Sequence, residues 1–372
     1  MTEKQKLSEI ASVFFKLGSI AFGGPAVHIA MMEEEVVVKR KWMSRSHFLD
    51  LIGVTNLIPG PNSTEMTMHC GYQRAGWKGL VVAGVSFIFP AIFITAIIAW
   101  LYLQYGQLPQ VRPFVYGIKP AVVVIVLLAA WKLGAKAIKS RILFVFGVIA
   151  LSFSLLGGNE IVALFGVGLL GLIWFLIART KNTFGSLIPF SVVLNLATQL
   201  TPLKIFGIFS KIGVLLYGSG YVLFAFLEAE LVTKGYLTSQ VLIDAIAVGQ
   251  FTPGPVLSTA TFIGWQLHGF PGALAATVGI FIPSFLLVFI TYPFVSKIRS
   301  SKVISAFLDA VNVAAIALIA SVGLSMFKDS VTDWRTFTIL VGSFLMVKFV
   351  QKLNSMYLII GGSFLGYVLS YF

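Results

Sequence analysis

The sequence predicts an all-α polytopic membrane protein made of two homologous halves of inverted topology, with broken or re-entrant helices meeting at the membrane midplane. Three observations point to this fold class: the composition, a series of long apolar stretches, and an internal repeat. The 372 residues are 58% hydrophobic and 11% charged, with a mean hydropathy of +0.93. A soluble domain carries about a quarter charged residues, so this composition excludes a soluble globular or disordered chain.

The charge is unbalanced, with 27 Lys and Arg residues against 14 Asp and Glu residues. A nucleic-acid-binding protein would need those basic residues on a solvated face, whereas membrane proteins collect Lys and Arg in short cytoplasmic loops. We therefore expect a lipid bilayer around the protein and no nucleic-acid partner. The single cysteine, Cys70, and four histidines without ligand spacing predict no disulfide, no metal site and no cofactor.

Several apolar stretches have the composition of membrane spans, which need about 20 mostly apolar residues. Clusters of Gly, Pro and charged residues separate them. The stretch Leu187–Leu200 lies between the two sets of spans, and it could be an interfacial linker or an extra span. The predicted spans are Trp77–Gln104, Phe114–Trp131, Ile142–Leu156, Ile161–Ile177, Ala273–Val295, Val303–Phe327, Phe337–Val350 and Met356–Phe372.

Two further apolar regions of the first half are interrupted. Ser12–Met32 is broken at Gly23-Gly24-Pro25, and Phe48–Tyr72 is broken at Pro59-Gly60-Pro61. The pieces beside the second break are about 11 residues long, which is too short to cross a bilayer. They are suited to two half-helices that meet inside the membrane.

The second half of the chain repeats the first. The segment FKLGSIAFGGPAVHIAMMEEE, from Phe15, aligns with SKIGVLLYGSGYVLFAFLEAE, from Ser210, and Pro59-Gly60-Pro61 aligns with Pro253-Gly254-Pro255. The separation is 193–195 residues, so the chain is a duplicated domain and not a solenoid. We expect an N-terminal repeat at residues 1–180, a linker or extra span at 181–204, and a C-terminal repeat at 205–372.

Matching loops of the two halves carry opposite charge bias. Lys132–Arg141 is rich in basic residues and its counterpart is not, whereas Gly157–Glu160 has none and its counterpart region carries Lys348 and Lys352. Because cytoplasmic loops are enriched in Lys and Arg, this change of side favours inverted topology. It places Lys39–Arg45 and Lys132–Arg141 in the cytoplasm.

The motifs resemble those of the chromate ion transporter family. FGGPAVHIAMMEEE, from Phe22, is followed by NLIPGPNS, from Asn56, and by GYQRAGWKG, from Gly71. The second copy, with QFTPGPVLSTATFIGWQLHG from Gln250, is similar to the family's C-terminal domain. The resemblance implies an integral membrane carrier of chromate with two domains of opposite orientation, and proton-coupled export as its activity.

The helix breaks suit a tetrahedral dianion such as chromate or sulfate. A helix N-terminus offers backbone N–H groups and a partial positive charge, and inverted-repeat carriers place broken helices at the midplane. Plain kinks or close packing of small residues would explain the same glycines. The predicted substrate-binding residues are Asn56, Gly60, Asn62, Ser63, Thr64, Gln250, Gly254, Ser258 and Thr259, with Gly23, Gly24 and Gly218 as a facing wall.

A few charged residues are candidates for anion attraction and proton coupling. Lys119 lies just inside a predicted span, where it could attract the anion or extend its amine to the interface. Glu33, Glu228 and Glu65 are the predicted proton carriers, because a carboxylate in an apolar site gains proton affinity. Glu33 could equally belong to a solvated turn.

The sequence therefore predicts a secondary transporter of chromate in the cytoplasmic membrane, and not an enzyme. Transport of sulfate or a related oxyanion is the alternative. A membrane enzyme acting on an oxyanion is a different class, and it would need a redox cofactor or a nucleophile with a base. An exposed face of small residues could pair two copies as a homodimer, although no feature of the sequence demands it.

Overall fold

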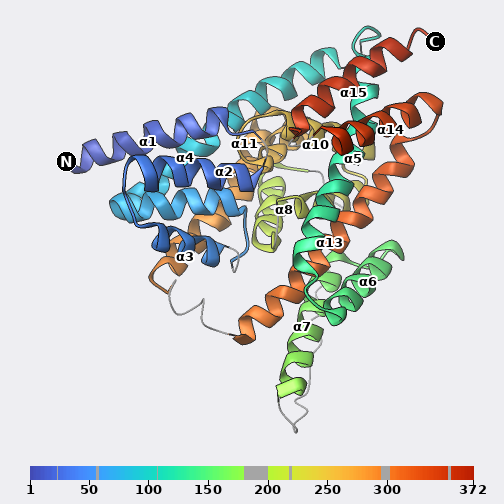
Figure 1. The fold of residues 1–372 in the computed structure, drawn as a ribbon. Helices are drawn as coiled ribbons and strands as arrows, with labels where there is room; N and C mark the ends of the chain where they lie inside the picture. The colour runs from blue at the N-terminus through green and yellow to red at the C-terminus, as the bar shows by residue number, and fades with distance from the viewer. Residues whose placement is uncertain are drawn as a thin grey trace.

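The computed structural model describes residues 1–22, 24–55, 58–106, 108–179, 200–217, 220–294, 302–350 and 353–372, and their regular structure is helical. Two groups of helices lie beside each other (Figure 1). One group contains α1 (Glu3–Ile20), α2 (Pro25–Met32), η1 (Glu33–Lys39), α3 (Arg45–Thr55), α4 (Asn62–Tyr105), α8 (Pro202–Leu215), α9 (Val222–Leu227), η2 (Glu228–Val232), α10 (Ser239–Phe251), η3 (Val256–Ser258), α11 (Thr259–Thr291) and η4 (Tyr292–Phe294). The other contains α5 (Arg112–Ala137), α6 (Arg141–Leu155), α7 (Glu160–Arg179), α13 (Lys302–Ser330), α14 (Trp334–Phe349) and α15 (Ser355–Leu369).

The longest helices, α4 and α11, are hairpins. Each contains a glycine with positive φ, Gly76 at 62° and Gly269 at 57°, next to a second residue with non-helical dihedral angles. Beyond the turn in α4 the chain folds back so closely that Gly71 lies against Gly79. A short arm therefore lies against a long arm in each hairpin, with the arms at 62–74 and 77–105 in α4, and 259–267 and 270–291 in α11.

The two hairpins are arranged head to tail. The hydroxyl of Tyr292, at the far end of α11, donates to Oε1 of Gln73 at the tip of the α4 hairpin. The amide Nε2 of Gln266, at the tip of the α11 hairpin, donates to the carbonyl of Ala99 near the far end of α4 at 3.2 Å. Gln73 and Gln266 occupy matching positions in the two repeats. The long arms of the two repeats therefore run antiparallel.

The second group of helices interleaves the repeats. α5 packs against α14 and α15 of the second repeat, and α13 packs against α6 and α7 of the first. Leu127 of α5 contacts the position of Gly323 in α13, and Gly134 lies near Ile316, so this matched pair is also antiparallel. Each repeat thus completes its packing with helices of the other.

The molecule has the surface of a multi-pass membrane protein. Among the described residues, five helices are long and apolar enough to cross a bilayer: α4, α5, α7, the helix formed by η3 and α11, and α13. Every fourth residue along both long arms exposes an apolar side chain, as expected for a lipid-facing stripe. These residues are Val81, Val85, Phe89, Phe93 and Ile97 on α4, and Leu274, Val278, Ile282, Leu286 and Ile290 on α11.

The predicted spans are confirmed as helices, but some are shorter than a full span. α6 and α15 have 15 residues each and α14 has 16, or about 23 Å at 1.5 Å per residue against a hydrocarbon core of about 30 Å. The chain leaves α6 at Gly157, which has a φ of 82°. Of the stretch Leu187–Leu200, only Leu200 is among the described residues.

The close approach inside the α4 hairpin makes a testable prediction. Gly71→Ala places a Cβ against the Gly79 carbonyl and the Ala83 methyl, and such overpacking costs about 1–3 kcal/mol. We expect a lower melting temperature of the purified protein in detergent. Gly361→Ala in α15, where an added Cβ meets nothing within 4 Å, is the matched control and should be neutral or stabilising. Equal melting temperatures for the two variants would contradict the hairpin packing.

Candidate functional site

The two Pro-Gly-Pro breaks are joined to the opposite repeats by backbone hydrogen bonds. Gly60, with a φ of 143°, donates its N–H to the carbonyl of Leu216 at 2.6 Å, directly after α8. Gly254, with a φ of 87°, donates to the carbonyl of Ala21 at 2.9 Å, directly after α1. Leu216 and Ala21 are matching positions. Positive φ explains why glycine occupies both breaks.

Polar side chains without hydrogen-bond partners lie at the Gly60 break and one turn beyond it. Thr64 and Glu65 follow the break on α4 and Ser284 faces it from α11, and these three form the Gly60 cluster; a Cβ on Gly60 would collide with Glu65 Oε1 and with Ser284 Oγ. His69 lies one turn after Glu65 on α4. All four side chains are buried. The Thr64 hydroxyl, both Glu65 oxygens, both His69 nitrogens and the Ser284 hydroxyl have no hydrogen-bond partner. Buried polar groups are normally bonded, so this cluster needs an explanation.

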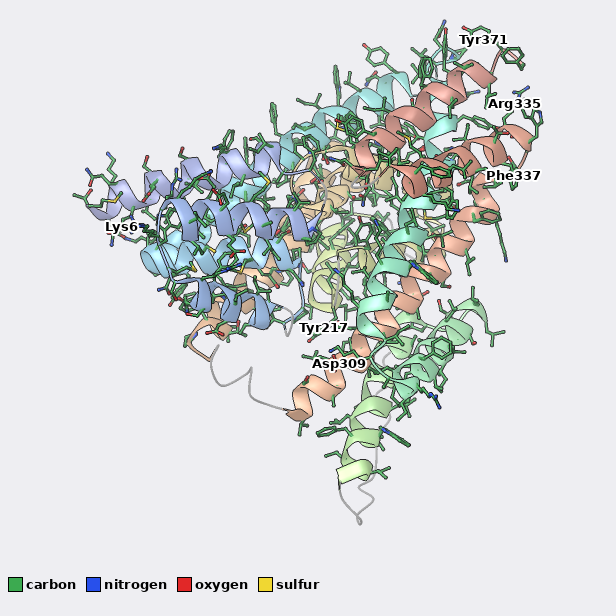
Figure 2. The ribbon with its side chains drawn as sticks, viewed as in Figure 1. Lys6, Tyr217, Asp309, Arg335, Phe337 and Tyr371 are labelled. Atoms are coloured by element: carbon green, nitrogen blue, oxygen red, sulfur yellow. The ribbon has the colours of Figure 1, made fainter. Side chains whose placement is uncertain are left out.

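Tyr217 borders the same cluster. It follows Leu216, whose carbonyl holds Gly60, and it lies close enough to Glu65 for the two side chains to interact electrostatically. Figure 2 places Tyr217 near the middle of the molecule, far from Lys6 on the outer part of α1. The Gly60 cluster thus lies inside the protein between the helices of both repeats.

The matching break at Gly254 has different chemistry. Position 65 corresponds to Ser258, whose hydroxyl lies 3.4 Å from that of Thr252. Positions 69 and 284 correspond to Phe262 and Ala91, and a Cβ on Gly254 would meet Ala91 Cβ at 3.0 Å. The Gln250 amide beside this break has no partner for its Nε2, but no titratable side chain takes the place of Glu65 or His69. The two breaks therefore share a backbone and differ in side-chain chemistry.

The remaining predicted binding residues lie at several places. Asn62 and Ser63 begin α4, and Ser258 ends η3 with its hydroxyl 3.4 Å from that of Thr252. Gln250, one turn before the second break, accepts from the Tyr221 hydroxyl at 3.4 Å while its Nε2 has no partner. Gly24 is the N-cap of α2. The predicted residues Gly23, Asn56 and Gly218 lie outside the described residues.

Lys119 lies at the other end of α10 from the Gly254 break. Its amine donates to Oε1 of Gln240, near the start of α10. The Gln240 amide in turn donates to the carbonyl of Asp329 at 3.2 Å. The structure therefore does not bring Lys119 to either Pro-Gly-Pro break.

The predicted proton carriers have three different surroundings. Glu65 belongs to the Gly60 cluster, whereas Glu33 accepts from Arg45 Nε at 2.8 Å on the surface. Glu228 is half-buried, and its Oε2 has no partner. Burial raises the pKa of Glu228, and the neighbouring carboxylates of Asp329 and Glu160 raise it further.

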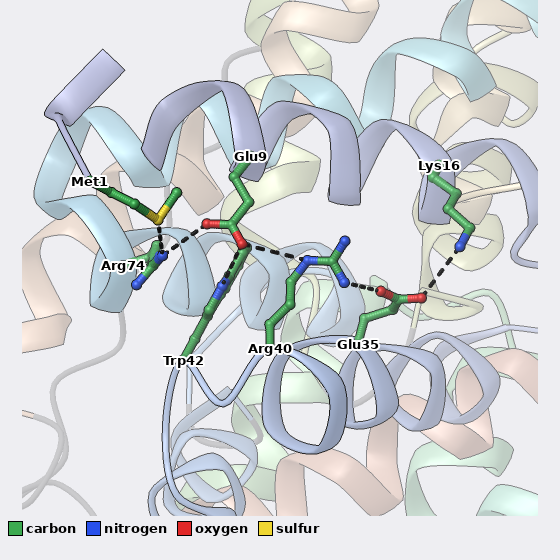
Figure 3. A network of polar contacts seen from close by, with 7 residues as sticks. All are labelled: Met1, Glu9, Lys16, Glu35, Arg40, Trp42 and Arg74. Atoms are coloured by element: carbon green, nitrogen blue, oxygen red, sulfur yellow. Dashed lines mark hydrogen bonds and ion pairs between the residues drawn. The ribbon is translucent and has the colours of Figure 1, made fainter. Parts of the chain in front are cut away.

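Matched ion pairs connect the first helix of each repeat to the π-helical segment that follows the second helix, α1 to η1 and α8 to η2. In the first repeat, Glu35 of η1 forms ion pairs with Lys16 at 3.4 Å and with Arg40 at 2.6 Å (Figure 3). Arg40 is also paired with Glu9. A second basic residue, Lys39, lies 3.4 Å from Glu35. These pairs hold α1 against η1.

The second repeat contains a matching but smaller set of ion pairs. Lys211 of α8 lies 2.5 Å from Glu230, and Lys234 lies 2.6 Å from it. Although burial opposes ionisation, hydrogen bonds from these lysines hold the pKa of Glu230 below its ordinary range.

A separate cavity of about 540 Å³ lies between α4, α5, α10 and α15. Its walls are apolar apart from Asp244, Tyr102 and Ser363. Asp244 is inside α10 and accepts from the Tyr102 hydroxyl at 2.6 Å. Its other oxygen has no partner.

Ser284, at the Gly60 break, and His69, one turn beyond Glu65, are unpartnered polar residues that sequence reasoning missed. His69 lies four residues after Glu65, a spacing that puts both on one helix face. Ser284 follows Pro283, which matches Pro90, and the polar replacement of Ala91 by Ser284 is visible in the repeat alignment. That contrast between the copies was the available signal.

Glu230 and Glu228 should have opposite effects on stability. The lowered pKa of Glu230 means that its contribution is complete above the ordinary glutamate range and is lost on acidification. The raised pKa of Glu228 means that stability falls as pH rises past that range. We expect Glu230→Gln to reduce the free energy of unfolding at neutral pH by about 1–2 kcal/mol. The melting temperature should fall accordingly. Glu228→Gln should raise it. Melting curves at neutral and acidic pH test both signs, and the same sign for both variants at neutral pH would refute the assignment.

Comparisons with known proteins agree on one family. The family model described as chromate transporter matches residues 8–172 and 203–367. A probable chromate transport protein of Synechococcus elongatus is 31% identical over 344 residues, covering 90% of this chain and 88% of the relative. A chromate transport protein of Cupriavidus metallidurans is 29% identical, covering 97% of this chain and 93% of the relative.

An uncharacterized transporter of Methanocaldococcus jannaschii is 26% identical over 96% of this chain and 92% of the relative. No solved structure matches the chain significantly. The family is one of transporters and not of enzymes. The two family matches together cover most of the sequence, on both sides of residues 180–199. This chain therefore belongs to the chromate transporter family.

Proposed function

We propose that this protein is a secondary transporter that exports chromate across the cytoplasmic membrane with protons, by alternating access between its two halves. The observation that carries the proposal is the buried, unpartnered cluster of Thr64, Glu65 and Ser284 at the Gly60 break. Polar groups in an apolar interior are costly and mark substrate or proton paths in membrane proteins. The chromate transport proteins to which the chain is similar supply chromate as the substrate class.

The cluster can bind a tetrahedral dianion only when it presents donors. The hydroxyls of Thr64 and Ser284 can donate, and so can the first turn of α4 at Asn62 and Ser63. Glu65 repels an anion as a carboxylate but donates a hydrogen bond as a carboxylic acid. No Lys or Arg among the described residues is paired with Glu65. The anion and one proton on Glu65 therefore move in the same step.

This coupling is compatible with export. A dianion accompanied by one proton still carries one net negative charge. The membrane potential, negative inside, acts on that charge with about 2.3 kcal/mol per 100 mV and drives it outward. Export then needs no nucleotide. A pH gradient modulates the rate because the proton travels with the anion.

The arrangement of the hairpins supports inverted topology. Matching long arms run antiparallel, as they must if the repeats have opposite orientations in the bilayer. The short arm of α4 has 13 residues between Asn62 and Arg74, about 20 Å at 1.5 Å per residue, so it suits a re-entrant half-helix. The repeat boundaries at residues 180 and 205, and a homodimer, stay predictions.

Sulfate or a related oxyanion is the alternative substrate, because it presents the same four oxygens and charge. A membrane enzyme acting on an oxyanion is disfavoured by membership in a transporter family. Flux of chromate and of sulfate into proteoliposomes, with the oxidation state of chromium measured in parallel, separates these possibilities. Reduced chromium would indicate an enzyme.

Closing the Gly60 break should stop transport. In Gly60→Ala the added Cβ meets Glu65 and Ser284, and the φ of 143° disfavours any side chain. We expect membrane insertion with chromate flux reduced by about 10²-fold, because a misplacement of about 1 Å has effects of that size. Gly361→Ala is the control and should retain parental flux. Unchanged flux in Gly60→Ala would refute this site.

Replacing Glu65 with a residue that cannot release a proton should remove the pH dependence of chromate transport. Glu65→Gln keeps an amide donor for the anion but cannot release a proton. We expect chromate exchange to persist and to become nearly independent of pH, measured in proteoliposomes at equal pH on both sides. Glu34→Gln, a surface carboxylate 3.6 Å from Lys39, should behave as the parent. Parental pH dependence in Glu65→Gln would assign the proton to another group.

A further inference from the structure

A line of titratable side chains connects the Gly60 cluster to the surface of α3. Glu65 and His69 are fully buried on one face of α4. His47 of α3 is half-exposed, and it lies close enough to His69 for the two imidazoles to interact electrostatically. The line begins at the surface segment that includes Arg45, which is paired with Glu33. It ends at the break.

Several nitrogen and oxygen atoms along this line have no hydrogen-bond partner. Both ring nitrogens of His69 lack a hydrogen-bond partner, and so do His47 Nε2 and both Glu65 oxygens. A histidine relays a proton by accepting it on one ring nitrogen and releasing it from the other. A structural histidine would instead be bonded, as His28 is to the carbonyl of Ala21 at 3.0 Å.

Aromatic residues line the path. The Tyr292 ring of η4 lies 5.7 Å from the His69 ring and 4.0 Å from the Tyr72 ring, measured between centroids. Tyr292 is bonded to Gln73. The other titratable groups near the line are Cys70, next to His69, Tyr217, beside Glu65, and Asp50, on α3. No Lys or Arg among the described residues is ion-paired with Glu65 or His69.

The repeat provides an internal comparison. Positions 47, 65 and 69 correspond to Val241, Ser258 and Phe262 in the second repeat, and Tyr292 corresponds to Ala99. The second repeat has the same hairpin but no titratable group at these four positions. The fold alone therefore does not require these side chains.

We propose that His47 and His69 form a proton relay that loads Glu65 from the α3 side of the protein. A proton from water binds the His47 ring, passes to one nitrogen of His69, and leaves the other nitrogen for the Glu65 carboxylate, which becomes a carboxylic acid. The relay rests on the proposed function, because it supplies the proton that accompanies the anion.

Two fluxes in proteoliposomes separate the relay from the anion site. Exchange of labelled for unlabelled chromate at equal pH requires anion binding but no net proton movement. Net chromate flux driven by a pH gradient requires both. We expect His69→Phe to retain exchange and to lose gradient-driven flux by about 10²-fold, the scale of a lost proton-transfer group. His47→Phe should lose less, because water reaches that half-exposed position.

The control is His268→Phe, an exposed histidine in the turn of the α11 hairpin, which should retain both fluxes. Parental gradient-driven flux in His69→Phe and His47→Phe would overturn the relay while leaving the transporter proposal intact. Loss of both fluxes in His69→Phe, with parental behaviour of His47→Phe, would also overturn it. A parent protein that exchanges no oxyanion would overturn the proposed function itself.

Discussion

A helix that breaks inside an apolar interior exposes backbone groups that only the protein can satisfy. Here each break is satisfied by the other repeat, through the bonds from Gly60 to Leu216 and from Gly254 to Ala21. Those carbonyls are available because α1 and α8 end there. α1 packs on α4 and α8 packs on α11, with Gly18 and Gly213 allowing the close approach. The reciprocal bonds therefore fix the positions of the helices that surround both breaks.

The symmetric backbone carries asymmetric chemistry. The same geometry holds Ser284 against one break and Ala91 against the other, and Glu65 in one repeat where Ser258 stands in the second. Only the first set leaves buried polar atoms unbonded. Once two copies share one backbone plan, one of them can keep the binding groups while the other serves packing. A single anion site at the Gly60 break is the economical arrangement.

Much of the fold could be predicted from the sequence, because apolar length and repetition are local signals. The spans, the repeat and the break at Gly60 are examples. The hairpins at Gly76 and Gly269 were missed, since a continuous apolar run hides a turn made by one glycine with positive φ. In the site, Glu65 was recognised from its distance to the break. Ser284 was not recognised, because it lies 219 residues after Glu65 in the sequence and only tertiary packing brings the two side chains together. The pairing of Lys16 with Glu35, across 19 residues, likewise depends on how α1 packs against η1.

The interleaving of the repeats has a consequence for biosynthesis. When the ribosome has completed the first repeat, the N–H of Gly60 lacks its carbonyl and α5 lacks α14 and α15, because those residues are not yet made. Insertion of individual helices can proceed during synthesis, but their packing must wait for the end of the chain. Truncation after the first repeat should consequently leave an inserted but loosely packed intermediate. Quality-control proteases would recognise it by its unfilled helix contacts, and not by a failure to enter the membrane.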